Sequence, residues 1–119
     1  MTAHDPIAEV EAIVAKAREA QSEYELNGSQ ARYDRAAAAV AWAIMKPERN
    51  RELAEMAVAT TGLGNVPDKI TKNHRKTLGL MRDIQPVKSY GIIKDDPATG
   101  ITEIARPIGV VGSVVPSTN

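Results

Sequence analysis

Apolar residues recur at three- and four-residue steps along the first part of the chain, which is the spacing of one face of a helix. Over residues 6–26 this pattern ends at Asn27 and Gly28, and the cap-forming side chain of Ser29 opens a second helix. The pattern therefore predicts two helices, the second with a buried stripe. The apolar positions are Ile7, Val10, Ile13, Val14, Ala17 and Tyr24 in the first, and Tyr33, Ala37, Val40, Ala41 and Ile44 in the second, with Trp42 near its edge.

Two further helices are predicted from proline, glycine and asparagine. Pro47 suits a first helical turn, so a third helix starts there and ends before Gly62 and Gly64. Asn65 caps a fourth helix, which ends near Pro86. The predicted buried residues are Leu53, Met56 and Ala57 in the third helix, and the predicted face of the fourth is Ile70, His74, Leu78, Met81 and Ile84.

Extended structure is predicted after the helices. Residues 90–94 and 101–105 flank the turn-rich segment 95–100, which is typical of a β-hairpin with a longer loop. The almost continuous apolar run over residues 109–115 predicts a strand covered on both faces, as in a parallel sheet. A parallel strand needs helical crossovers, and the sequence ends four residues after Val115, so we expect a truncated α/β domain. The alternative is a third antiparallel strand in a self-contained helical domain.

Composition narrows the class of protein. The 119 residues suffice for one ordinary folded domain, and no apolar run approaches the length of a membrane-spanning helix. The start of the sequence lacks the features of a secretion signal, so we expect a cytoplasmic protein. Fifteen basic and fifteen acidic residues cancel, which gives no reason to expect a nucleic-acid partner.

The residue types also limit the chemistry. The chain contains no cysteine, which excludes disulfides, thiolate metal sites and thiol nucleophiles within it. His4 and His74 have no acidic or histidine neighbour at helical ligand spacing, so we expect no metal site. Neither histidine sits in a recognisable setting for activating a hydroxyl nucleophile.

Three stretches resemble the CoA-acylating aldehyde dehydrogenases: residues 14–21 (VAKAREAQ), 60–73 (TTGLGNVPDKITKN) and 104–119 (IARPIGVVGSVVPSTN). The similarity follows the chain in order and includes the turn at Asp95, Asp96 and Pro97. It implies the amino-terminal portion of a much longer enzyme with an α/β fold. In that scheme residues 1–86 are the helical part of an NAD(P)-binding domain, residues 87–107 are the hairpin of an oligomerisation arm, and residues 108–119 are the first strand and loop of a Rossmann-like sheet.

The resemblance also implies a reaction. A cysteine thiolate attacks a small aldehyde, a hydride passes to NAD or NADP, and CoA takes the resulting thioester. Because the catalytic domain that carries the cysteine is absent, we expect this chain alone to be inactive. The complete enzyme is expected to be a homo-oligomer. Which aldehyde it uses, and whether NAD or NADP, is not encoded in these residues.

Site residues follow from the resemblance at the end of the sequence. Val115, Pro116, Ser117 and Thr118 would line the nicotinamide end of the cofactor, and Asn119 would aim its amide at the aldehyde oxygen. Without the resemblance, the same Pro-Ser-Thr-Asn run has the composition of an ordinary polar turn.

Other features have simpler explanations. Gly109 and Gly112 open a strand rather than a helix, so they favour close backbone packing over phosphate binding. The segment 61–64 fits a helix terminator. A basic cluster on the fourth helix fits either a solvated face or the phosphates of CoA, and consists of Lys69, Lys72, Arg75 and Lys76.

The alternative function of the chain is that of a non-catalytic helical module, which pairs with a full-length subunit through its hairpin or final strand.

Overall fold

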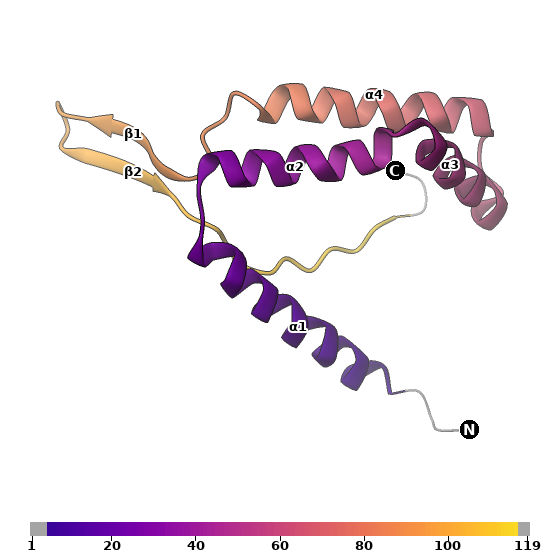
Figure 1. Cartoon of the computed structure of the whole chain (residues 1–119), viewed down its shortest axis with the longest axis horizontal. Coiled ribbons are helices and arrows are strands. Elements are labelled where there is room, and N and C mark those ends of the chain that lie inside the picture. The colour runs from indigo at the N-terminus through magenta and orange to yellow at the C-terminus, as the bar shows by residue number, and fades with distance from the viewer. Residues whose placement is uncertain (1–4, 117–119) are drawn as a thin grey trace. The chain divides into compact units, whose positions relative to one another are not determined.

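The structure is a computed structural model, and it describes residues 5–116. The described residues form four helices and one antiparallel pair of strands, as predicted (Figure 1). The elements are α1 (Pro6–Leu26), α2 (Gln30–Met45), α3 (Pro47–Thr61), α4 (Val66–Ile84), β1 (Gly91–Asp96) and β2 (Ile101–Ala105). They divide into two compact units: α1 with the hairpin and the chain up to Val114, and the three helices between Gln30 and Ser89.

The first and last helices begin at side-chain caps. The Asp5 carboxylate accepts the backbone N–H of Ile7 at 3.0 Å, a cap that sequence reasoning missed. Asn65 caps α4 as predicted, because its side-chain oxygen accepts the N–H of Asp68 at 2.9 Å. Each cap satisfies an amide that has no partner within its helix.

The boundaries of α3 also match the prediction. Pro47 is its first residue, where the missing N–H costs nothing. Gly62 ends the helix with a φ of 67°, a conformation that glycine adopts without a steric penalty. No helix within residues 5–116 combines the length and the apolar content needed to cross a membrane.

The core of the three-helix unit is small and lies where α3 meets its neighbours. Figure 1 shows α2 and α4 running antiparallel, with α3 at one end of the pair. Ala41 of α2 and Ala54 of α3 are buried, and small side chains let helix backbones approach closely. The polar side chain of Asn50 is only 3% exposed and sits one turn before Ala54.

Several predicted core residues are exposed. Met56 is 54% exposed because it lies about 200° around α3 from the buried Ala54. Val40 is 65% exposed because the contact face of α2 passes through Ala41 instead. On the predicted face of α4, Ile70 and Met81 are half-buried. The other predicted members of that face are exposed: His74, Leu78 and Ile84.

The hairpin forms near the predicted positions, with β1 reaching two residues further than expected. Its register has a bulge between Ile92 and Lys94. Lys94 then lies opposite Glu103, and the ammonium and carboxylate are 3.5 Å apart. The turn closes where the carbonyl of Asp96 accepts the N–H of Gly100 at 2.9 Å.

The structure forms no strand over residues 109–115, neither the predicted strand of a parallel sheet nor the alternative third antiparallel strand, so the sheet assignment stays a prediction. Residues 106–116 form neither helix nor strand, and the sheet within the described residues contains only β1 and β2. A strand is held by hydrogen bonds to a neighbouring strand, and no strand within the described residues pairs with this segment. The close packing predicted at Gly109 and Gly112 is also not seen, since an added Cβ would meet no atom within 4 Å.

Candidate functional site

The sequence-predicted site lies at the carboxyl end of the chain. Val115 and Pro116 are exposed and are the last two residues of the irregular segment 106–116. Ser117, Thr118 and Asn119 lie outside the described residues. The oxyanion role of Asn119 and the nicotinamide contacts of its neighbours therefore stay predictions.

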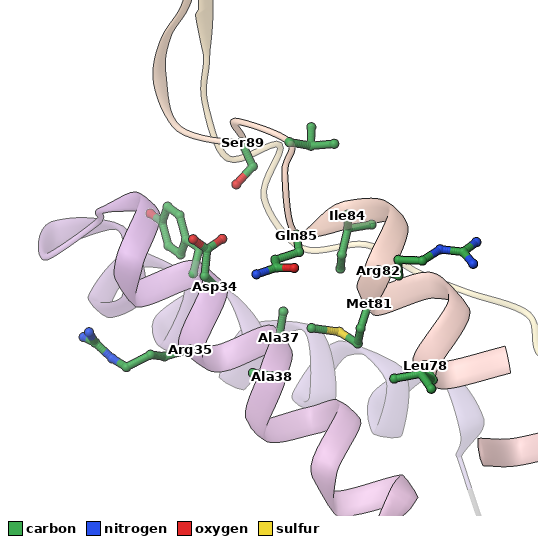
Figure 2. Close-up of a pocket in the computed structure, with 12 residues that line it drawn as sticks. Asp34, Arg35, Ala37, Ala38, Leu78, Met81, Arg82, Ile84, Gln85 and Ser89 are labelled. Carbon is green, nitrogen blue, oxygen red and sulfur yellow. The ribbon is translucent and has the colours of Figure 1, made fainter. Parts of the chain in front are cut away.

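An open hollow in the three-helix unit lies between the first half of α2 and the second half of α4 (Figure 2). Its volume is about 1000 Å³. Apolar side chains dominate its lining: Ala37, Ala38, Leu78, Met81, Ile84 and Val87. Leu78 and Ile84, on the predicted face of α4, are 51% and 40% exposed, so the hollow is open to solvent. The surface is therefore suited to apolar contact.

Ser89 lines this hollow and is held in place by Gln30. The backbone N–H of Ser89 donates to Gln30 Oε1 at 2.8 Å, and Gln30 Nε2 donates to Ser89 Oγ at 3.1 Å. The same amide nitrogen donates to Asp34 at 2.7 Å. This reciprocal pair holds the chain after α4 against the start of α2. Sequence reasoning missed it, because the partners are 59 residues apart and no local signal joins them.

The charged and polar groups around the hollow do not form a catalytic arrangement. Figure 2 shows the Arg35 and Arg82 side chains directed away from it. Arg82 instead pairs with Asp83, with nitrogen and oxygen 2.9 Å apart. The hydroxyl of Ser89 faces an amide rather than a base, so it lacks the neighbour that activates a nucleophile. Residues 5–116 also bring no three metal-ligating side chains together.

The side chains of the basic cluster of α4 differ in exposure. Lys69 and Lys72 are half-buried, whereas Arg75 and Lys76 are exposed. Arg75 borders a smaller hollow of about 330 Å³ beside α3. Asn50 also borders it, but its amide is engaged with α4: it donates to the Ile70 carbonyl at 3.0 Å and accepts from Asn73 at 2.9 Å. The polar group at this place therefore joins helices.

Comparison with known proteins identifies relatives along most of the chain. It is 63% identical over 110 residues, 92% of its length, to the sulfoacetaldehyde dehydrogenase (acylating) of Cupriavidus necator. It is 42% identical over 76% of its length to the protein of the same name from Bilophila wadsworthia. Identity to the bifunctional aldehyde-alcohol dehydrogenase AdhE of Escherichia coli is 35% over 95% of the chain.

The matched regions are a minor part of these relatives. The chain spans 22% of the Cupriavidus protein, 20% of the Bilophila protein and 12% of the Escherichia protein. It corresponds to their amino-terminal part. No family model matches the chain, and no solved structure matches it significantly.

Proposed function

We propose, since the chain is a homologue of the amino-terminal part of the CoA-acylating aldehyde dehydrogenases, that it contributes to an enzyme that oxidises a short aldehyde to an acyl-CoA. The observation that carries this is the 63% identity over 110 residues to an acylating enzyme. NAD or NADP would accept the hydride, and CoA would be the second substrate. The nucleophilic cysteine would be supplied by polypeptide outside these 119 residues.

Sulfoacetaldehyde is the substrate that we propose for the complete enzyme. The Cupriavidus relative, which is named for sulfoacetaldehyde, is 63% identical to the chain, whereas the aldehyde-alcohol dehydrogenases are 35% to 48% identical. The higher identity to the enzyme named for sulfoacetaldehyde favours the sulfonated aldehyde over acetaldehyde.

We also propose a role for each part of the chain within the longer enzyme. We assign residues 1–86 to the helical cover of an NAD(P)-binding domain and residues 87–107 to an oligomerisation arm. Residues 108–119 would be the first strand and loop of the dinucleotide-binding sheet. Val114 is 99% exposed in this structure, as expected for a strand residue whose neighbours come from other polypeptide. The carboxyl end of such a strand is where dinucleotides bind in open α/β sheets.

Asn119 has the chemistry for one step of this reaction. When a thiolate adds to the aldehyde carbon, negative charge develops on the carbonyl oxygen. A side-chain amide held beside that oxygen donates a hydrogen bond that strengthens as the charge grows. We therefore propose Asn119 as the oxyanion donor and Val115 to Thr118 as the wall of the nicotinamide site.

A chimera tests these assignments. Residues 1–119 of this chain replace the corresponding segment of the Cupriavidus relative, and CoA-dependent NAD(P)H formation is measured with sulfoacetaldehyde and acetaldehyde. We expect activity with a preference for sulfoacetaldehyde. Asn119→Ala should lower turnover by about 100- to 1000-fold with little change in the KM for cofactor. The control Asn27→Ala, at the exposed end of α1, should leave turnover unchanged.

Two results would contradict the proposal. A folded chimera without CoA-dependent activity would contradict the proposed reaction. An active chimera in which Asn119→Ala has normal turnover would show that the oxyanion donor is another residue.

The hairpin favours a second function, that of an interaction module. Four of its isoleucines are exposed: Ile92, Ile93, Ile101 and Ile104. An exposed strand edge with apolar side chains can add a strand from another chain. Binding of the isolated chain to the full-length Cupriavidus relative, lost on Ile104→Lys, would support this function without any turnover.

A further inference from the structure

The middle helix of the three-helix unit has an unusual sequence. Residues 36–45 of α2 contain no charged residue and no side-chain amide or hydroxyl group. Ten residues make nearly three turns, so the apolar character extends around the whole helix. A helix that is apolar on every side is typical of the interior of a larger protein, whereas a surface helix is apolar on one face.

Only part of this helix is covered in the structure. Ala41 is buried, and Ala37 and Ile44 are half-buried, on the side where α2 meets α3 and α4. The opposite side, which we call the free face of α2, is exposed. It consists of Ala39, Val40, Trp42 and Ala43, with Val40 65% and Trp42 60% exposed.

The adjoining helix shows what a solvent-facing surface of this unit looks like. The exposed positions of α3 include Glu48, Arg49, Arg51, Glu52 and Glu55. Arg49 and Glu52 form an ion pair on that surface, with nitrogen and oxygen 2.8 Å apart. The open side of α3 is therefore charged, whereas the open side of α2 carries a tryptophan, a valine and alanines. This contrast indicates that the two surfaces have different surroundings.

We infer that the free face of α2 is an internal packing surface of the complete enzyme, covered by apolar side chains from the part of that enzyme outside the region homologous to this chain. The inference rests on the proposed function, because it requires the longer protein. In the Cupriavidus relative, 78% of the length (100 minus 22) lies outside the matched region, so covering polypeptide is abundant. Trp42 is the natural anchor, since a large aromatic side chain gains most from burial.

The size of the face argues against a second copy of the chain as its occupant. At 60% exposure, Trp42 presents on the order of 150 Å², and its three neighbours are small. A stable interface between separate proteins buries about 800 Å² per partner. The rest of the complete enzyme is covalently linked to this region and is therefore present at a high effective concentration, so a small surface is enough for the two parts to pack together.

Two matched lysine substitutions test the inference. Val40→Lys places a charge on the free face of α2, and Met56→Lys places one on the charged side of α3, where the native side chain is 54% exposed. In the 119-residue chain, neither should change the melting temperature, because both sites face water. In the chimera with the Cupriavidus relative, Val40→Lys should lower the apparent melting temperature by about 3 °C or more, and Met56→Lys by less than about 1 °C.

A milder pair covers the case in which the lysine chimera is not recovered in folded form. Val40→Thr keeps the shape of valine and adds one hydroxyl, and it should lower the melting temperature of the chimera more than Met56→Thr does. Melting is measured without substrate, so loss of the proposed enzymatic function would not be mistaken for failure of this inference.

Trp42 reports directly on the isolated chain, because it is the only tryptophan. Its fluorescence should show the emission of a water-exposed indole and ready quenching by acrylamide. A protected Trp42 would overturn the inference, since the face would then be covered within the 119 residues. Dimerisation of the chain that Val40→Lys abolishes would assign the face to a second copy. Equal melting of the Val40 and Met56 chimeras would show that the face stays in water.

Discussion

At the scale of the residue, Asn50 joins α3 to α4 from a buried position. Its amide donates to the Ile70 carbonyl and accepts from Asn73. We predict that Asn50→Ala lowers the free energy of unfolding by about 1–3 kcal/mol, because it leaves the Asn73 amide without this partner in a partly dry site. Urea denaturation followed by circular dichroism measures the change.

The double variant controls for a general effect of removing an amide. Asn73→Ala alone should cost less, since Asn73 is half-buried, and adding it to Asn50→Ala should cost less than the sum. Strict additivity, or an Asn50→Ala protein as stable as the parent, would show that this pair does not hold the helices together.

The same residue shows where sequence reasoning stops. Pro47 and Asn65 were correctly predicted as helix starts, because their effects act within one turn. The partners of Asn50 lie 20 and 23 residues away, and nothing near Asn50 in the sequence marks them. The prediction that Met56 is buried failed for the same reason, because partners distant in sequence decide the outcome. Local spacing defines a helix face, but the position of the neighbouring helix decides which face is covered.

At the scale of the element, two glycines of the α3–α4 pair, one inside a helix and one at a helix end, should respond oppositely to alanine. Gly79 lies inside α4 with ordinary helical backbone and open space around it. Gly79→Ala should stabilise the chain by about 0.5–1 kcal/mol, because alanine loses less backbone entropy on folding. Thermal melting of the chain measures the gain.

Gly62 provides the matched comparison. It also has open space, but its φ of 67° is unfavourable for a residue with a side chain. Gly62→Ala should therefore destabilise the chain by about 1 kcal/mol. A change of the same sign at both glycines would mean that backbone conformation does not govern either site.

The extended segments mark the limit of periodicity at this scale. The hairpin was predicted because its two strands are close in sequence and supply each other's hydrogen bonds. The apolar run over residues 109–115 has equal strand character, yet it remains unpaired within the described residues. A strand needs a partner as well as a pattern, and the pattern does not say where the partner is.

At the scale of the whole molecule, we predict that the isolated chain associates. Val110, Val111, Val114 and Val115 are exposed, and such apolar extended chain tends to pair with another copy. Sedimentation velocity should show concentration-dependent oligomers that Val114→Lys reduces. Val40→Lys should not reduce them, because the face it alters is too small to hold two chains together. A single monomeric species at every concentration would contradict the prediction.

The last prediction concerns activity of the 119-residue chain, which should be absent. The proposed reaction begins with a thiolate adding to a carbonyl carbon, and the chain contains no cysteine. A serine or threonine would need an adjacent base; Ser89 faces an amide, and His74 is exposed on α4. Purified chain supplied with sulfoacetaldehyde, CoA and NAD or NADP should therefore give no NAD(P)H above the blank, whereas the chimera that restores the rest of the enzyme should. Reproducible NAD(P)H formation by the chain alone would show that its residues carry a nucleophile of another kind, and the assignment to a thiolate mechanism would have to be given up.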